Sequence, residues 1–400
     1  MMTDVRTASS VMISTVMPVK ILVPFNTSGL LYGMERAVIE LFDSLRPRVT
    51  PHFLISHTML RQKLPVLAEV QRRGLSHSFF SDTEEWPSFR RPHSFRLAWE
   101  LTVALLKGNR DVFRQAMQCD ALYLCGVRYS FYSFLACIYC VLAGKRVIFQ
   151  FHDLITYRSR ILPILRFFVR DFIHDTEIGF RMVSKSNPCV LKRNNHVIPY
   201  VVQTPDTNGT DDLPETLARG KRTILFVGQV SAHKGVDLLL EAVALLDGYP
   251  DMLLLIIGAC SPEFQPAFDA LLADERIAKR VVHLGYRKDV FRFLAGAYVY
   301  VHPTPPSRFL EAFGRSALEA MACGIPTICF RAGAIEEVVV HGETGLICDV
   351  EDPGCLAGSL RQFLDNRQFR DVCGAQAKKR FETVYSAQRL EAAWKKLLTI

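Results

Sequence analysis

The sequence predicts an α/β protein built from two doubly wound domains that face each other across a cleft. The chain has 400 residues, enough for two or three domains of about 150 residues. Hydrophobic residues make up 49% and charged residues 22%, which is ordinary for a globular protein and argues against disorder or a fibrous repeat. Short β-rich runs alternate with stretches at helical spacing, and the alternation restarts after a polar segment, so we expect two parallel sheets.

The first half of the chain begins with an apolar run at Lys20–Pro24, followed by turn residues and by apolar positions at helical spacing in Glu35–Leu45. These features predict a buried strand and a helix. Further strands are predicted at His52–Ser56, Ala121–Cys125, Arg146–Phe151 and Phe180–Val183. Because helical stretches separate these runs, the strands are expected to be parallel.

The second half repeats the pattern. Strands are predicted at Thr223–Val227, Met252–Ile257, Val281–Leu284, Val299–His302 and Thr327–Phe330, and helices at Val236–Leu246, Glu263–Ala273, Arg315–Cys323 and Leu356–Asn366. We therefore divide the chain into an N-terminal Rossmann-like domain at 1–202 with a loose tail at 1–17, a linker at 203–221, a C-terminal Rossmann-like domain at 222–385 and a helix at 386–400. Leu390, Trp394 and Leu397 share one face of this last helix, which is expected to pack back toward the N-terminal domain.

The net charge of +8 is unevenly divided, with +11 over residues 1–200 and −3 over residues 201–400. Such asymmetry indicates that one half of the protein meets something anionic: a membrane surface, a phosphorylated substrate or a nucleic acid. No nucleic-acid recognition motif is present, so we do not expect a nucleic-acid partner.

The cysteines and the apolar runs indicate in which cellular compartment the protein is expected. The 11 cysteines are scattered, mostly in apolar runs, which favours free thiols over a disulfide framework. No secretory signal is evident, and the longest uncharged apolar run, between Arg128 and Lys145, is shorter than the roughly 20 residues of a spanning helix. We therefore expect a cytoplasmic protein without a transmembrane segment.

Several common activities lack their sequence signatures. No two glycines are spaced as G-x-G, so the dinucleotide fingerprint is absent, and Gly228–Gly235 lacks the Gly-Lys-Ser/Thr of a P-loop. There is no G-x-S-x-G elbow and no H-E-x-x-H motif. No Asp-x-Asp pair is present to hold a divalent metal on a diphosphate, so we expect neither a metal nor a resident cofactor.

The segment Pro303–Pro326 carries the strongest chemical signal. A predicted strand ends before it, its proline-containing loop holds Glu311, and Gly314 opens a helix on which Glu319 lies. Free backbone N–H groups at the start of this helix would form an anion site; they belong to Phe313, Gly314 and Arg315. Two carboxylates beside an anion site suit neutral polyols, such as sugar hydroxyls and a ribose diol. The alternative is a surface loop with solvated glutamates.

Three shorter segments carry weaker signals. Lys234 follows the strand Thr223–Val227 and could hold a diphosphate as an unpaired point charge, although Lys-Gly turns are common on surfaces. Gly33 lies at the start of the first helix, where a glycine lets the backbone approach a phosphate. His152 lies at the end of the strand Arg146–Phe151, where a histidine is either structural or faces the interdomain cleft.

These residues resemble the retaining glycosyltransferases of the GT-B fold, of the family-4 type (glycosyl transferases group 1). The resemblance is strongest over Thr223–Tyr385 and weaker, but in order, over Lys20–Val202. Its most specific part is the pair Glu311-x7-Glu319. The other matching segments are Phe313-Gly314, Gly228-Gln229-x4-Lys234-Gly235, Gly285-Tyr286, Gly333–Glu337, Gly342, Thr344 and Gly345, Tyr32–Arg36 and His152.

The resemblance implies a role for each matching residue. Catalytic roles fall to Glu311 beside the transferred sugar, Lys234 on the diphosphate, and the active-site histidine His152. Glu319 would bind the nucleotide ribose. The other implied donor-binding residues are Gly33, Gly228, Gln229, Tyr286, Phe313, Gly314 and Arg315.

The chain departs from the family pattern at several positions. Gln229 stands where the family has Arg, which removes one charged contact to the diphosphate. Tyr32 stands where the early loop has its first glycine, Ala334 replaces another glycine, and Ile198–Val201 replaces the usual Ile-Pro-Asn-Gly at the domain junction. The retained Glu311 and Lys234 favour an active enzyme.

The resemblance implies metal-independent transfer of a hexosyl unit from a UDP- or GDP-sugar, with retention of configuration. The N-terminal domain would meet the acceptor, and its +11 charge points to an anionic surface. Basic and apolar residues interleave over Tyr157–Arg170, as on a helix at a bilayer, so we expect a lipid-linked or polysaccharide-precursor acceptor and peripheral contact with the inner face of the membrane. A core helix with solvated arginines explains that stretch equally well.

Other function classes remain open at this point. A GT-B-fold sugar-nucleotide epimerase or a phosphorylase would use similar domains, but the further acid–base residues or the lysine that each needs give no clear signal. A non-enzymatic basic protein that binds membranes or nucleic acids, or an inactive scaffold, would leave the pair Glu311 and Glu319 unexplained.

Overall fold

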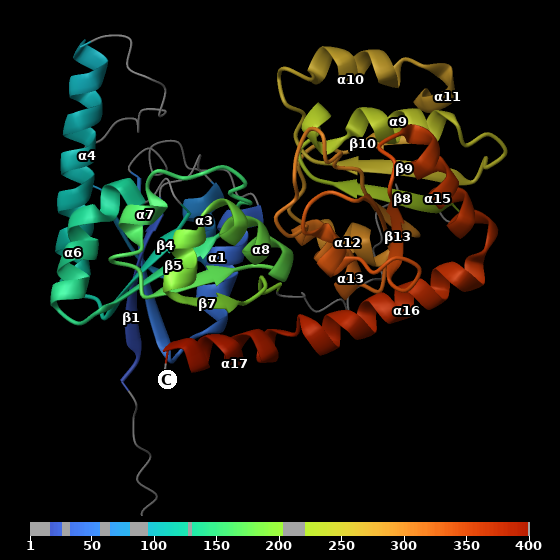
Figure 1. Ribbon diagram of the computed structural model, residues 1–400. Coiled ribbons are helices and arrows are strands. Elements are labelled where there is room, and N and C mark those ends of the chain that lie inside the picture. The colour runs from blue at the N-terminus through green and yellow to red at the C-terminus, as the bar shows by residue number, and fades with distance from the viewer. Residues whose placement is uncertain are drawn as a thin grey trace, which may run out of the picture.

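The computed structural model describes residues 17–25, 33–56, 65–80, 95–126, 130–202 and 221–398. These residues form two α/β domains, each built on one parallel sheet, as the sequence predicts. Figure 1 shows the two domains side by side, with the last helices running from one to the other. The segments 1–16 and 203–220, which hold most of the predicted tail and linker, lie outside the described residues.

The N-terminal sheet has the strand order β3-β2-β1-β4-β5-β6-β7, with every pair parallel. Its strands are β1 (Val19–Phe25), β2 (Val49–Ile55), β3 (Ser76–Phe79), β4 (Ala121–Cys125), β5 (Arg146–Phe151), β6 (Asp171–His174) and β7 (Asn194–Val197). Its helices are α1 (Gly33–Ser44), α3 (Pro65–Arg72), α4 (Phe95–Ala116), α6 (Phe134–Leu142), α7 (Leu162–Leu165) and α8 (Glu177–Ser186). The strand order reverses between β1 and β4, where doubly wound sheets bind their ligands.

The C-terminal sheet has the strand order β10-β9-β8-β11-β12-β13, again all parallel. Its strands are β8 (Arg222–Val227), β9 (Met252–Ile257), β10 (Val281–His283), β11 (Val299–His302), β12 (Thr327–Phe330) and β13 (Gly345–Cys348). Its helices are α9 (Val236–Ala244), α10 (Gln265–Leu272), α11 (Glu275–Ala278), α12 (Val290–Ala295), α13 (Arg315–Ala322), α14 (Ile335–Val338) and α15 (Pro353–Asp365). Here the order reverses between β8 and β11.

Both sheets are covered on two faces, which is why their strands are continuous apolar runs rather than alternating ones. Every residue of β9 is buried, and its side chains alternate between two clusters on opposite faces of the sheet: Leu254 and Ile256 lie in one, and Leu253, Leu255 and Ile257 in the other. No helix within the described residues combines the length and apolarity needed to cross a membrane.

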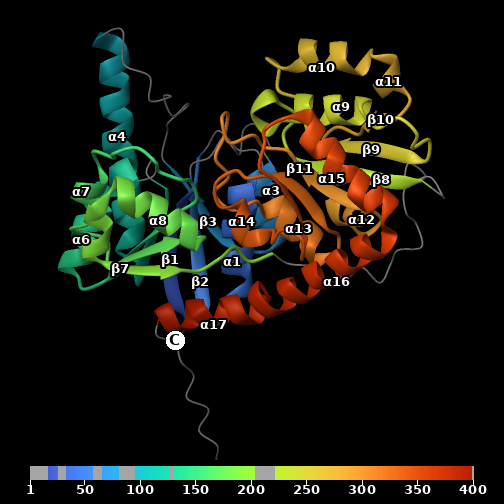
Figure 2. The same cartoon turned by 45° about the vertical axis from the view of Figure 1, so that its right-hand side comes forward.

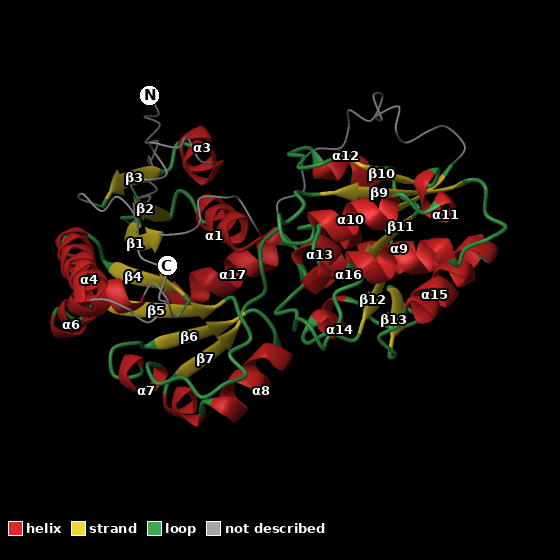
Figure 3. Ribbon diagram, turned by 90° about the horizontal axis from the view of Figure 1, so that it is seen from above, coloured by secondary structure: helices red, strands yellow, loops and turns green. Residues whose placement is uncertain are grey.

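The C-terminal helices join the domains. Helix α16 (Arg367–Val384) packs on α13 of the C-terminal domain, and α17 (Ala387–Leu398) lies against the N-terminal domain (Figures 2 and 3). Leu390 and Trp394 of α17 are buried in the same cluster as Phe42, and the Trp394 ring lies 6.1 Å from that of Tyr123. The apolar face of α17 is thus part of the N-terminal core.

One predicted strand is wrong. Phe180–Val183 lies within α8, and the strand of this region is β6, earlier in the chain. The Thr176 hydroxyl accepts a hydrogen bond from the Gly179 N–H at 3.0 Å, so Thr176 is a helix N-cap whose signal outweighs the short apolar run.

The predicted helix over Tyr157–Arg170 is also wrong in extent. Only Leu162–Leu165 is helical, in α7, and the residues before Ile161 form an irregular, bent loop. The Asn187 side chain holds this loop, because its carbonyl oxygen accepts from Ser159 N–H at 2.8 Å and its NH2 group donates to the Tyr157 carbonyl at 3.1 Å. A long amphipathic helix therefore does not form here.

Candidate functional site

Glu311 lies at the carboxyl end of the C-terminal sheet, in the loop between β11 and α13. Its N–H donates to Ala332 at 3.2 Å and its carbonyl accepts from Ala334 at 2.7 Å, so the loop is pinned to the segment after β12. Gly314 then begins α13 at φ +89°, and a Cβ there would collide with Ile335. Glycine is needed at this position for both reasons.

The Glu311 carboxylate is held by two donors. Its Oε2 atom accepts from Lys234 Nζ at 2.8 Å and lies 3.0 Å from Nε2 of His302, the last residue of β11. Burial favours the protonated carboxyl, but the charge of Lys234 and the hydrogen bond from His302 outweigh it and hold the pKa of Glu311 far below its usual range. The expectation of an unpaired Lys234 is therefore wrong, because this lysine is ion-paired in the described structure.

Lys234 is placed by the turn between β8 and α9. The next residue, Gly235, adopts φ +70°, and a Cβ there would overlap the Pro303 carbonyl. The Lys234 ammonium also lies 4.6 Å from the centre of the Phe309 ring, in the same loop as Glu311. Two loops of the sheet edge are thus packed directly on each other.

The first turn of α13 presents backbone donors. Within the described residues, the N–H groups of Phe313, Gly314 and Arg315 donate to no protein acceptor. These groups form the positive end of an eight-residue helix, beside Glu311 and Lys234. The arrangement is able to bind a diphosphate.

The side chains of Arg315 and Glu319 face the N-terminal domain. Arg315 Nε donates to Glu319 Oε1 at 3.0 Å, and its Nη2 donates to Glu40 Oε2 of α1 at 2.6 Å. Arg36 of α1 also lies 3.5 Å from Glu319 Oε1. The Arg315 side chain is thus paired with two carboxylates through Nε and Nη2, whereas its Nη1 is buried without a hydrogen-bond partner among the described residues.

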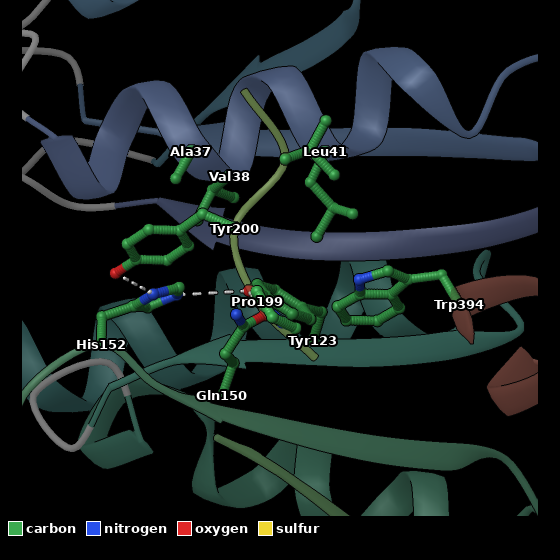
Figure 4. Close-up of a pocket in the computed structure, with 10 residues that line it drawn as sticks. Ala37, Val38, Leu41, Tyr123, Gln150, His152, Pro199, Tyr200 and Trp394 are labelled. Carbon is green, nitrogen blue, oxygen red and sulfur yellow. Dashed lines mark hydrogen bonds between the residues drawn. The ribbon is translucent and has the colours of Figure 1, made fainter. Parts of the chain in front are cut away.

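His152 lies at the carboxyl end of β5, and its side chain is 2% exposed, which favours the structural alternative over a position facing the interdomain cleft. In Figure 4 it points toward Tyr200, whose hydroxyl lies 3.0 Å from His152 Nδ1, and Tyr123 contacts its other nitrogen at 3.3 Å. Asp175 Oδ2 lies 3.4 Å from Nδ1. Burial lowers the pKa of the ring, but Cys125 and Asp175 outweigh it and raise the pKa of His152 to about 10.

Tyr200 connects this cluster to the other domain. Its ring lies 4.9 Å from that of Phe313, just before α13. Thr176 donates to the Ala312 carbonyl at 3.4 Å, and the Glu337 carboxylate accepts from the first N–H groups of α8, including that of Glu177 at 3.0 Å. The site therefore lies where the two domains touch.

The remaining predicted residues lie around this edge. Gly228 and Gln229 follow β8, and Gly258 is so close to the Gly228 carbonyl that a Cβ would not fit. Tyr286 is 52% exposed in the loop after β10. Gly33 begins α1, but Tyr32 and the loop before it lie outside the described residues.

Sequence reasoning missed His302, Asp175, Tyr200 and Glu40. The last two carried some signal: Tyr200 lies in the unusual Ile198–Val201 junction, and Glu40 is a charge on the apolar first helix. His302 and Asp175 are single polar residues at strand ends, which nothing in the sequence sets apart. Within the described residues, no group of three or more His, Cys, Asp and Glu side chains is placed to hold a metal ion.

Comparisons with known proteins agree with this architecture. Residues 210–380 match the family model of the glycosyl transferases group 1. The chain is 31% identical over 175 residues to an N-acetyl-alpha-D-glucosaminyl L-malate synthase of Bacillus anthracis, a match that covers 44% of each chain. It is 32% identical over 181 residues to a D-inositol 3-phosphate glycosyltransferase of Corynebacterium diphtheriae, covering 43% of this chain and 42% of the other. The chain thus spans less than half the length of these curated relatives.

Similarity to solved structures extends over both domains. The structure of Anabaena Alr3699/HepE in complex with UDP superposes with a TM-score of 0.75 at 17% identity, covering 96% of this chain and 100% of the other. At this identity the match establishes the fold alone, which is the GT-B fold. The likeness to the glycosyl transferases group 1 family is thus confined to the match of residues 210–380 with the family model.

Proposed function

We propose that this protein is a glycosyltransferase that moves a hexosyl unit from a UDP- or GDP-sugar to a lipid-linked or polysaccharide-precursor acceptor, with retention of configuration and without a metal or cofactor. The observation that carries the proposal is the contact of Lys234 with Glu311, 2.8 Å apart, beside the backbone N–H groups that begin α13. A cation and free amides suit a diphosphate, and an adjacent carboxylate suits a sugar hydroxyl.

The chemistry follows from where charge develops. Departure of the nucleotide diphosphate from the anomeric carbon places negative charge on its bridging oxygen and positive character on the sugar. Lys234 and the N–H groups of Phe313 and Gly314 would stabilise the leaving diphosphate. Glu311 would bind the sugar, and Tyr200, whose ring lies 4.9 Å from that of Phe313, would face it from the other domain, with His152 behind it.

HepE, which shares the fold, has been solved with UDP-glucose as well as with UDP. This supports a uridine diphosphate sugar as the first donor to test here. In this chain the donor would lie between the carboxyl ends of the two sheets, as in other open α/β sheets with a topological switch point.

An apolar and basic surface on the N-terminal domain supports acceptor binding at a membrane. Leu142 of α6 is 83% exposed, and Phe167, after α7, is 60% exposed. The two segments are neighbours, because the rings of Phe134 and Phe168 lie 5.3 Å apart, and Figure 2 shows both at the outer end of this domain. Arg170, 60% exposed, adds positive charge. We propose that this surface docks on the inner face of an anionic membrane.

Donor hydrolysis by the purified protein tests the enzymatic proposal. Wild type should release UDP or GDP slowly from one of the nucleotide sugars, and Glu311→Ala and Lys234→Ala should each lower that rate roughly 100-fold. Lys279→Ala, on an exposed turn, is the matched control and should behave as wild type. Equal rates in wild type and both site variants would refute the assignment.

Flotation with liposomes containing anionic phospholipid tests the membrane proposal. Wild type should float at low salt, and the double variant Leu142→Glu/Phe167→Glu should remain in the soluble fraction. Leu245→Glu in the C-terminal domain, where the leucine is 44% exposed, controls for a general loss of apolar surface. Failure of wild type to float at low salt would exclude this surface as a membrane contact.

A further inference from the structure

His302 is a buried side chain at the centre of the proposed donor site. It is the last residue of β11 and is 5% exposed. Its Nε2 atom lies 3.0 Å from Glu311 Oε2 and 3.2 Å from the Thr304 hydroxyl, and its Nδ1 atom lies 3.3 Å from the Tyr300 hydroxyl. The ring thus bridges a carboxylate and a second buried polar group.

The protonation of the ring follows from its neighbours. The Glu311 carboxylate is ionised, because its pKa lies far below the usual range, and an ionised carboxylate only accepts hydrogen bonds. His302 Nε2 therefore carries a hydrogen and donates a hydrogen bond to Glu311 Oε2. The Tyr300 hydroxyl faces Nδ1 and is itself 2.7 Å from the Ser316 hydroxyl in the first turn of α13. This fixes the ring relative to the helix that presents the free N–H groups.

Lys234 and His302 compete for the same oxygen of Glu311. Lys234 is a flexible side chain with three N–H donors, and a diphosphate arriving at the start of α13 would attract its ammonium. His302 cannot move in the same way, because it is buried and held at both nitrogens. It would therefore keep its contact with Oε2 when Lys234 turns to the phosphate.

We propose that His302 is a positioning residue that holds Glu311 ionised, with Oε2 occupied and Oε1 left for a hydroxyl of the bound sugar. The inference rests on the proposed function, since it concerns the same site. As a consequence, Lys234 binds the diphosphate, and His302 keeps its hydrogen bond to the Glu311 carboxylate. His302 acts through Glu311, so it affects the sugar and leaves binding of the nucleotide alone unchanged.

The experiment compares His302→Leu, which removes the donor, with His302→Gln, whose amide N–H can reach the position of Nε2. The probes are UDP-glucose with UDP, and GDP-mannose with GDP, each titrated calorimetrically and followed for hydrolysis. His302→Leu should bind UDP or GDP as wild type does, lose the additional affinity that the sugar provides, and show a kcat about 10- to 100-fold lower. His302→Gln should recover most of both losses.

His341→Leu is the control, because the His341 ring accepts from the Ile347 N–H of the same domain and, in the part of the chain that the structure describes, has no hydrogen bond to the proposed site. It should change neither kcat nor sugar affinity, even if the melting temperature falls. Wild-type kcat in His302→Leu, equal weakening of nucleotide and nucleotide-sugar binding, or a failure of His302→Gln to recover activity would each overturn the inference. If wild type neither binds nor hydrolyses either nucleotide sugar, the proposed function itself fails, and the His302 variants are not needed to show it.

Discussion

Arg315 on α13 donates a hydrogen bond to Glu40 on α1 at 2.6 Å, and both side chains are buried, 8% and 2% exposed. Glu319, Arg36 and Arg73 belong to the same group, so that cations and anions alternate across the boundary between the domains. The helix whose first turn presents the proposed phosphate site is therefore tied to the N-terminal domain by charge. The packing of the two domains against each other therefore also positions the proposed donor site.

Glu40→Gln should destabilise the protein by about 3 kcal/mol, because it leaves the buried Arg315 guanidinium without one of its two anions. Urea denaturation measures the loss. Glu391→Gln, which removes only a partner of Lys395 on α17, is the control and should change stability little. An unchanged unfolding midpoint for Glu40→Gln would mean that the pair of Glu40 and Arg315 makes no net contribution to the free energy of unfolding.

Stability should fall as the pH rises from about 6.5 toward 10, because the folded protein holds the His152 proton more tightly than the unfolded chain does. The pKa of this ring is raised from 6.5 to about 10, so its contribution is complete below 6.5 and is lost as the pH passes through the folded value. Asp175→Asn should flatten the decline in a urea series at pH 6, 8 and 9.5.

Asp153, the exposed residue that follows His152, provides the control for that series. Asp153→Asn also removes one carboxylate charge, but this carboxylate is not one of the hydrogen-bond partners of the His152 ring. Ring nitrogen NMR gives a direct check. Wild type should show a doubly protonated His152 at pH 8, and a neutral ring at that pH would contradict the raised pKa.

Gln229→Arg should tighten UDP-glucose binding by about 10-fold, because it adds a charged donor at the carboxyl end of β8, beside the proposed diphosphate site. Calorimetric titration measures the gain. Gln362→Arg makes the same change on the solvent side of α15 and should leave the affinity at the wild-type value. An equal affinity for Gln229→Arg and wild type would place residue 229 away from the diphosphate.

Trp394→Ala should cost about 3–5 kcal/mol, because it opens a cavity between α17 and the N-terminal sheet. Lys396→Ala, on the solvent side of the same helix, should be neutral. Urea unfolding, with cleavage of the N-terminal domain by a protease as the readout, distinguishes the two variants. Equal midpoints would mean that the helix adds no packing energy to that domain.

The sequence predicts the strands well where they are buried on both faces. Met252–Ile257, Val299–His302 and Thr327–Phe330 have the predicted bounds, since a central parallel strand is an uninterrupted apolar run. Phe180–Val183 fails because its three apolar residues, interrupted by Arg181, suit a helix face as well as a strand, and the deciding signal is the cap at Thr176.

The candidate site is only partly readable from the sequence. Glu311 and Gly314 lie close together along the chain, so a loop and a helix start reveal them. The pairing of Lys234 with Glu311 joins residues 77 positions apart, and Asp175 meets His152 only because β5 and β6 are neighbours. Such contacts depend on sheet order, which single-sequence patterns do not contain.

The position of α17 has a consequence for biosynthesis. Trp394 belongs to the core built around Tyr123 and Phe42, so the N-terminal domain lacks part of its interior until the ribosome has made residue 398. The C-terminal domain has no such dependence, because its strands and their covering helices are contiguous in the chain from β8 to α16. The domain synthesised first should thus be the last to complete its folding, and chaperones that hold nascent chains would have most contact with the N-terminal half of the molecule.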